Sequence, residues 1–391
     1  MLSINMDDVI NVINSIKGYL IGFGIVAVLL IVAMIACRKM KKSKKYLIRF
    51  NAVLGIVLAL GVTVNLILVG PMYSMVTLAT GGGKVSEENV ATATELCEDI
   101  ADEGIVLLDN AGTLPLAKNS KLNVFGWAST NPCYGGTGSG ALSDAYPTVS
   151  LLEGLTNAGF ELNTELSDFY TAYRADRPQV GMFAQDWTLP EPEAAQYSDD
   201  LINNAKAFSD TAMIVITRVG GEGADLPTDV STVTYDAGHS YNDFEPGEHY
   251  LQLSKTEEDM VDLVCKNFDN VIVVYNGANA MELGWVKDYS QIKSVIWCAG
   301  TGQSGFNALG SVLCGDVNPS GRTIDIFVYD LTATPTWNNF GNMLYDNMNE
   351  FEADSFGTKV TPAFVNYVEN IYVGYKFYET AAAEGLIDYD K

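Results

Sequence analysis

The sequence predicts an α/β protein in which a mostly parallel sheet carries helices on both faces, preceded by two transmembrane helices. Three observations support this fold class. Two uncharged apolar runs lie within the first 75 residues, and from about Ser86 onward helical patterns alternate with short β-type runs. The β-type runs are apolar on both faces, which is typical of parallel strands that helices cover on both sides.

The first 78 residues predict a membrane hairpin. The apolar runs at residues 18–37 and 50–70 contain no charged residue, and each has the length of about 20 residues that a helix needs to cross a bilayer. A cleaved signal peptide is the alternative, but its apolar core has only about 7 to 15 residues and follows a basic start. The segment before the first run is faintly acidic, and a second run follows. We therefore favour two spans.

The loop between the two runs is strongly basic. It contains seven cations within twelve residues: Arg38, Lys39, Lys41, Lys42, Lys44, Lys45 and Arg49. By the positive-inside rule such a loop stays in the cytoplasm. The protein is then expected in the cell membrane with both termini outside, so that the large domain after the hairpin is extracellular.

Four β-type runs define the predicted sheet, at residues 123–128, 211–219, 270–277 and 294–300. Helical patterns lie before and between them. The pattern at residues 86–104 opens with Ser86 as a candidate N-cap. The pattern at residues 254–268 has the spacing of a capping box, with Ser254 as the cap and Glu257 three residues later.

The charge and the composition exclude several classes of function. Eight of the 23 Lys and Arg and two of the 48 Asp and Glu precede Ala79, which leaves 15 against 46, a net charge of −31, from Ala79 onward. Binding of nucleic acid by this part needs cationic patches and is not expected. The six cysteines lack the close spacings of a metal site, and the chain has only two histidines, His239 and His249. No metal and no histidine-based triad are predicted.

A glycine-rich stretch at residues 134–140, YGGTGSG, resembles a dinucleotide-binding fingerprint. Such a fingerprint turns directly from a strand into a helix, so that the helix amino terminus meets the pyrophosphate. Seven residues separate this stretch from the preceding β-type run. We therefore exclude a nicotinamide site and predict no cofactor.

Glu222 is the leading candidate for chemistry. It stands between Gly221 and Gly223 in the stretch TRVGGEGAD, directly after the apolar run at residues 211–219. In parallel sheets ligands collect at the carboxyl ends of the strands, so Glu222 is expected in a cleft. A solvated acid in a turn is the alternative.

Six ordered strings of the chain resemble glycoside hydrolase family 3, the β-glucosidase and exo-glycosidase group. The first, ADEGIVLLDNAGTLPLAKNSKLNVFG, opens the resemblance to the family's α/β sandwich domain. CYGGTGSGALS, ITRVGGEGADLP, VIVVYNGANAMELGW, VIWCAGTGQSGFNALGSVLCGDVNPSGRTIDIF and NIYVGYKFYET follow in the family's order. With the helix before the first string, the resemblance covers residues 87–380.

The resemblance implies a retaining glycosidase in which the sandwich domain supplies the general acid/base and a separate (β/α)8 barrel supplies an aspartate nucleophile. The general acid/base corresponds to Glu222, in a loop that resembles G-E-G-x-D. Retention needs two carboxyl groups about 5 to 5.5 Å apart. The acid must be protonated near neutral pH, which burial against substrate and a nearby carboxylate can arrange.

Further residues are expected beside Glu222. Asn131, Tyr134 and the loop of Gly136 to Ser139 are expected to line the substrate cleft. Asp225, three residues after Glu222, is a further candidate for substrate binding. It either tunes the acidity of Glu222 or caps a turn, and we favour the turn.

The chain departs from the family pattern in two ways. Relatives often place arginine after the aspartate of the acid/base loop, where this chain has Leu226. No stretch could supply the barrel, which needs about 250 residues, so the nucleophile is expected outside the chain. We assign residues 86–335 to the sandwich domain, and 336–391 to a linker and the truncated start of a following domain, as in members with the sandwich before the barrel.

Two functions follow as expectations. The first is the membrane-anchored part of a retaining exo-β-glycosidase that hydrolyses O-glycosyl bonds in carbohydrate catabolism, inactive as the 391 residues alone. Its partners would be a β-glucoside or oligosaccharide, the lipid bilayer and a missing barrel domain. The second is a non-catalytic membrane-tethered module that binds carbohydrates or other partners.

Overall fold

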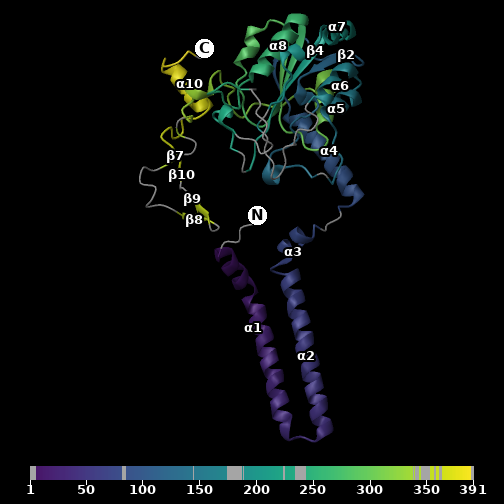
Figure 1. Cartoon of the computed structure of the whole chain (residues 1–391), viewed down its shortest axis with the longest axis vertical. Coiled ribbons are helices and arrows are strands. Elements are labelled where there is room, and N and C mark those ends of the chain that lie inside the picture. The colour runs from purple at the N-terminus through teal and green to yellow at the C-terminus, as the bar shows by residue number, and fades with distance from the viewer. Residues whose placement is uncertain are drawn as a thin grey trace. The chain divides into compact units, whose positions relative to one another are not determined.

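The computed structural model describes two compact units of the chain (Figure 1). One unit comprises Met1–Ser86 with Gly341–Val365, and the other comprises Glu87–Phe340 with Asn366–Lys391. The described residues are 6–81, 85–143, 145–173, 187, 189–222, 225–233, 244–337, 339, 343–344, 353–355, 358–360 and 363–388. The domain boundaries that the sequence predicts, at residues 78, 86 and 335, stay predictions.

Two long helices form most of the first unit. They are α1 (Met6–Ala36) and α2 (Lys42–Val69), joined by a short turn that includes the 3-10 helix Cys37–Lys39. The two candidate membrane spans, Val12–Lys39 and Lys42–Val69, have mean hydropathies of 3.0 and 2.6. Length and composition allow both to cross a membrane, although a signal sequence near the N-terminus meets the same criterion.

The apolar side chains of these helices point outward. Leu29 and Leu58, for example, are 63% and 61% exposed. The helices pack on each other where the backbone of Gly55 leaves room for the side chain of Leu30. The short helix α3 (Tyr73–Thr80) follows.

A six-stranded sheet is the centre of the second unit. Its strands are β1 (Val106–Asn110), β2 (Lys121–Phe125), β3 (Glu161–Leu162), β4 (Thr211–Arg218), β5 (Asn270–Gly277) and β6 (Ile292–Cys298), in the order β1-β6-β5-β4-β2-β3. Only β1 runs antiparallel to its neighbour, β6. The prediction of a mostly parallel sheet is confirmed.

Helices cover both faces of this sheet (Figure 1). Successive side chains of a strand point to opposite faces, so β4 gives Ala212, Ile214 and Ile216 to one hydrophobic cluster and Met213 and Val215 to the other. The first cluster includes α6 (Thr164–Ala172), α7 (Asp199–Phe208) and α8 (Lys255–Asn267). The second includes α5 (Leu151–Asn157) and α9 (Phe306–Cys314), and α4 (Glu87–Gly104) contacts α9.

The helix starts follow local side-chain chemistry. The predicted capping box at Ser254 is present: its hydroxyl accepts from the Glu257 N–H, and the Glu257 carboxylate accepts from the Ser254 N–H. Ser150 and Glu153 form a second capping box at the start of α5. Such reciprocal bonds satisfy backbone donors that have no partner within the helix.

Short elements complete the described chain. The strands β7 (Met343–Leu344) and β10 (Ala363–Phe364) pair antiparallel, as do β8 (Ala353–Ser355) and β9 (Thr358–Val360). The helix α10 (Tyr375–Ala383) belongs to the second unit.

Candidate active site

Glu222 lies just beyond the carboxyl end of β4. The strand is buried from Ala212 to Arg218, and four residues later the Glu222 side chain is exposed. β2 is the parallel neighbour of β4, so the chain that follows β2 emerges at the same edge of the sheet. The residues next in sequence, Gly223 and Ala224, lie outside the described residues.

The glycine-rich stretch after β2 holds the Glu222 carboxylate. The backbone N–H of Ser139 donates to Glu222 Oε2 at 2.9 Å, and the Ser139 hydroxyl donates to the same oxygen. The Thr137 hydroxyl donates to the backbone oxygen of Glu222 at 3.1 Å. The two loops, about 80 residues apart in sequence, therefore form one structure around a single acid.

Glycines allow the two loops to approach this closely. A Cβ atom on Gly138 would lie 2.6 Å from Glu222 Cβ, and Gly138 also has a positive φ of 62°. A Cβ atom on Gly221 would lie 2.4 Å from the backbone nitrogen of Thr137. Larger residues at either position would separate the loops, because these distances are far below van der Waals contact.

Ser139 favours the ionised form of Glu222. Its hydroxyl, and then its backbone N–H, lower the pKa of the Glu222 carboxyl below the ordinary value. Hydrogen bonds to an ionised carboxylate favour that form. In this chain Glu222 is therefore a carboxylate at neutral pH, the form that accepts a proton.

Other predicted site residues have mixed surroundings. Tyr134 is half-buried, its ring meets Phe306 edge-on at 5.3 Å, and its carbonyl accepts from the Gly302 N–H at 2.7 Å. Asn131 donates to the Thr130 hydroxyl at 3.2 Å. Gly136 packs against the Gly220 carbonyl, and Asp225 is exposed. Their roles toward a substrate stay predictions.

Buried polar side chains of the strands hold the loops of the site by hydrogen bonds. The Asn276 side chain, in β5, accepts from the Cys133 N–H at 2.6 Å and donates to the Cys133 carbonyl at 3.1 Å. This fixes the start of the glycine-rich stretch. Asn276 was not among the predicted site residues, although an asparagine inside an apolar strand is a signal for such a role.

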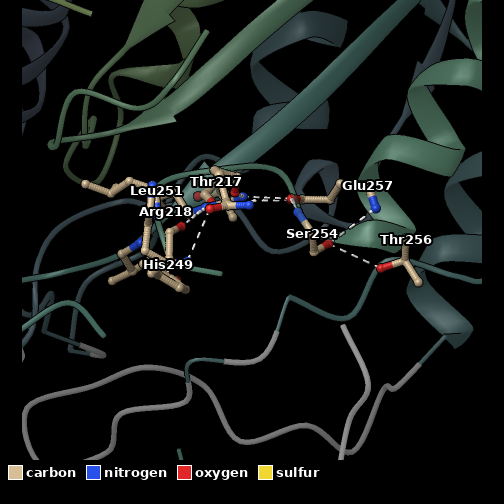
Figure 2. Close-up of polar contacts among 10 residues, drawn as sticks. Thr217, Arg218, His249, Leu251, Ser254, Thr256 and Glu257 are labelled. Carbon is tan, nitrogen blue, oxygen red and sulfur yellow. Dashed lines mark hydrogen bonds and ion pairs between the residues drawn. The ribbon is translucent and has the colours of Figure 1, made fainter. Parts of the chain in front are cut away.

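Arg218, four residues before Glu222, is held by an ion pair with Glu257 (Figure 2). Its guanidinium is fully buried at the end of β4 and bonds both oxygens of Glu257 at 2.7 and 2.9 Å. It also donates to the carbonyls of Tyr250 and Gln252. A single arginine at the end of an apolar strand was the missed signal here, because a buried cation needs a partner.

A second buried network lies under the loop after β2. The Glu191 carboxylate accepts from the Trp127 N–H at 2.7 Å and from the hydroxyl of Tyr197, which in turn contacts the Tyr170 hydroxyl at 2.7 Å. Burial raises the pKa of Glu191 to about 8. No sequence pattern singled out Glu191, since it lies in an irregular segment.

The two histidines, and the prediction that the chain holds no metal, do not involve the Glu222 loop. His249 is buried, and its Nε2 lies 3.0 Å from Glu282 Oε1, so it serves packing within the fold. His239 lies outside the described residues. Among the residues that the structure describes, no group of three His, Cys, Asp or Glu side chains is placed to hold a metal ion.

The chain is similar to β-glucosidases in sequence. It is 32% identical over 298 residues to the beta-glucosidase A of Butyrivibrio fibrisolvens, covering 73% of this chain and 32% of that protein. It is 28% identical over 293 residues to a beta-glucosidase of Ruminococcus albus, covering 74% of this chain and 27% of that protein. The chain thus spans about a third of the length of the curated relatives that it matches.

The fold is also similar to a solved β-glucosidase. The beta-glucosidase 3B of Thermotoga neapolitana, solved in complex with glucose, superposes with a TM-score of 0.56 at 27% identity, covering 75% of this chain and 37% of that one. Residues 105–375 match the sequence model of a protein family, the glycosyl hydrolase family 3 C-terminal domain. Because this match includes most of the chain and both loops of the site, the protein belongs to glycosyl hydrolase family 3 through that domain.

Proposed function

We propose that this chain is the membrane-anchored part of a retaining exo-β-glycosidase of the β-glucosidase type, and that Glu222 is its general acid/base. The observation that carries the proposal is the set of hydrogen bonds that the glycine-rich stretch makes to Glu222. Two loops from neighbouring parallel strands hold its carboxylate exposed at the carboxyl edge of the sheet, where ligands of such sheets bind. The apolar helices α1 and α2 are proposed as the anchor, with the sandwich domain outside the cell.

The proposed chemistry divides the two carboxyl groups between two partners. In the first step a nucleophilic carboxylate forms a bond to the anomeric carbon, and Glu222 gives its proton to the departing glycosidic oxygen. In the second step Glu222 takes a proton from water, and that water breaks the glycosyl-enzyme bond. The nucleophile is proposed to come from a (β/α)8 barrel outside these 391 residues.

The lowered pKa of Glu222 means that the proposed partner domain would also have to raise this pKa. In this chain the Ser139 hydrogen bonds favour the ionised form, whereas the first step needs the protonated form. A nucleophile carboxylate about 5 to 5.5 Å away and burial under a bound sugar both raise the pKa of an acid. We propose that assembly of the complete site, with substrate, protonates Glu222.

A non-catalytic module that binds carbohydrate is the second candidate. The observation in its favour is the same hydrogen-bonded, ionised state of Glu222, which suits a binding loop as well as a resting base. The two candidates differ in what a complete polypeptide does to a glycosidic bond.

The test compares this chain with the continuous reading frame in which it occurs. Both are purified and assayed on aryl β-glucosides as wild type, as Glu222→Gln and as Asp210→Asn, a matched control because Asp210 is an exposed acid at the opposite end of β4. We expect the 391 residues to be inert and a longer frame with a barrel to be active, with only Glu222→Gln abolishing turnover.

Two outcomes would decide against this account. Turnover by the 391 residues alone, lost in Glu222→Gln, would place the nucleophile within this chain. A frame that ends at Lys391, together with an inert protein that binds sugars, would favour the binding module.

A further inference from the structure

The turn between α1 and α2, together with the first turns of α2, is rich in positive charge. The seven cations from Arg38 to Arg49 lie in a part of the chain that has no Asp or Glu between positions 9 and 86. Among the described residues, none of the seven lies within ion-pair distance of an acidic side chain. These cations are therefore available to an anionic ligand.

Three of these cations line a shallow, open groove along the first turns of α2, and all of its lining residues belong to this one helix. The groove is formed by Lys42, Lys45 and Arg49 together with Tyr46, Phe50, Val53, Ser43 and Leu47. The cations are three and four residues apart, so they lie on one face of the helix. The rings of Tyr46 and Phe50 stack beside them, with centroids 6.3 Å apart and planes 15° from parallel.

The groove changes its chemistry along the helix. At the first turn of α2 the groove is basic. The backbone N–H groups of this turn are also free, because Lys41 provides no side-chain cap. The middle of the groove is aromatic, as is common where a helix passes the headgroup level of a bilayer. Val53 then continues into the apolar run at residues 50–70. Along the helix, a site for an anion is thus followed by aromatic rings and then by apolar side chains. This order matches an amphiphile that has an anionic head and an apolar tail.

We propose that this groove binds an acidic phospholipid of the inner leaflet, an inference that rests on the membrane anchor of the proposed function. The phosphodiester lies against Lys42, Lys45 and Arg49, and an acyl chain lies along Tyr46, Phe50 and Val53. A nucleic acid or a soluble phosphate would use the cations but not the apolar wall that continues from them. The bound lipid fixes the depth of the hairpin in the bilayer.

Native mass spectrometry of the whole chain tests the groove. The protein is released from micelles that contain equal amounts of phosphatidylglycerol and phosphatidylcholine, and the retained lipids are counted. Each cation near an anionic surface strengthens binding roughly fivefold. We expect phosphatidylglycerol to be retained over phosphatidylcholine by about tenfold or more.

A matched pair of variants separates the groove from a general attraction to the basic turn. The triple variant Lys42→Gln, Lys45→Gln and Arg49→Gln removes the cations of the groove, and we expect it to reduce the preference to within about twofold. The triple variant Arg38→Gln, Lys39→Gln and Lys41→Gln removes the same charge from residues that do not line the groove. It is expected to keep most of the preference.

Flotation with neutral phosphatidylcholine vesicles separates this inference from the anchor. A chain that floats with these vesicles, resists alkaline extraction and prefers the acidic lipid in the groove-dependent way supports the proposal. Insertion without that preference, or an equal loss in both triple variants, would overturn the lipid site and leave the anchor standing. Failure to insert would overturn both.

Discussion

At Glu222, two hydrogen bonds from Ser139 act on one carboxylate oxygen. A general acid needs the opposite influence, since it must hold its proton until the leaving oxygen takes it. The glycine-rich loop positions the Glu222 side chain within this chain. Under the proposed role, the carboxylate would gain its proton only in the complete site.

Replacement of Ser139 tests its influence on Glu222 at the residue scale. We expect Ser139→Ala to raise the pKa of Glu222 toward the ordinary carboxyl value, because the hydroxyl is the largest cause of its low pKa. The measurement is an NMR titration of the labelled Glu222 carboxyl. Ser143→Ala, in the same loop but bonded to the Ala145 N–H instead, should leave the titration unchanged. A wild-type pKa at or above the ordinary value would contradict the role of Ser139.

Both residues of this contact were predicted to belong to the site, but their contact was not. Glu222 follows a strand end and Ser139 lies in a glycine-rich stretch, so each is visible in its local sequence. Their hydrogen bond joins loops about 80 residues apart, and no local pattern encodes that distance. Local sequence also cannot show a pKa, which depends on the assembled neighbours.

At the scale of single elements, the end of β4 depends on the ion pair between Arg218 and Glu257. Both side chains are buried, and the distance of 2.7 Å between Arg218 Nη2 and Glu257 Oε2 is that of a strong charged hydrogen bond. The pair joins the strand that leads to Glu222 with the first turn of α8. It therefore links the stability of the domain to the geometry of the site.

Removal of one partner should be costly. We expect Glu257→Ala to lower the free energy of unfolding by roughly 3 to 5 kcal/mol, because the buried guanidinium then lacks a counter-charge. Urea unfolding followed by circular dichroism measures the change. Asp259→Ala breaks an exposed ion pair with Lys255 on the same helix and should leave the unfolding curve almost unchanged. Equal effects of the two variants would contradict the anchoring role.

Glu191 makes the stability of the domain dependent on pH. Burial raises its folded-state pKa from the ordinary 4.5 to about 8. The groups that face it are the Tyr170 and Tyr197 hydroxyls, with Glu257 as a further nearby charge. Because the folded state binds the proton more tightly, the stabilisation is complete below about pH 4.5 and is lost as the pH rises to about 8.

Urea unfolding between pH 5 and pH 9 tests this dependence. In that window the stability should fall by up to about 1.4 kcal/mol per pH unit until the folded-state pKa is passed. Glu191→Gln, which cannot ionise, should remove this slope, whereas Glu193→Gln, at an exposed site two residues later, should keep it. If the free energy of unfolding of the wild type and of Glu193→Gln rose with pH over this range, the protonated state of Glu191 would be contradicted.

The elements themselves were predicted unequally well. The four runs that form β2, β4, β5 and β6 are apolar over several residues, and a strand is present in each of them. The predicted end is wrong for the run at residues 123–128, where the strand ends at Phe125 and the 3-10 helix Trp127–Ser129 follows. β1 directly follows a helix and was taken only as part of a family string, while β3 has two residues, too few for a pattern. The Glu191 network was missed because it lies in an irregular segment, where burial comes from the packing of distant elements.

At the scale of the whole molecule, the chain holds one recognisable part of a larger enzyme type. The family match covers residues 105–375, and the part of the chain that matches the curated relatives covers about a third of their length. The fold class and the family could both be predicted from sequence, because strand patterns and ordered strings are properties of the chain alone. The substrate and the proposed nucleophile could not, since no ordered string of this chain identifies either of them.

Azide rescue of a Glu222 variant is the most direct test of the central claim, that Glu222 is the general acid/base of a retaining glycosidase. In the continuous reading frame, Glu222→Ala should reduce the hydrolysis of an aryl β-glucoside by about a hundredfold or more. Azide, which needs no general base, should restore turnover and give β-glucosyl azide. Unchanged hydrolysis in Glu222→Ala, or a loss that azide does not restore while Asp210→Ala stays fully active, would contradict the account.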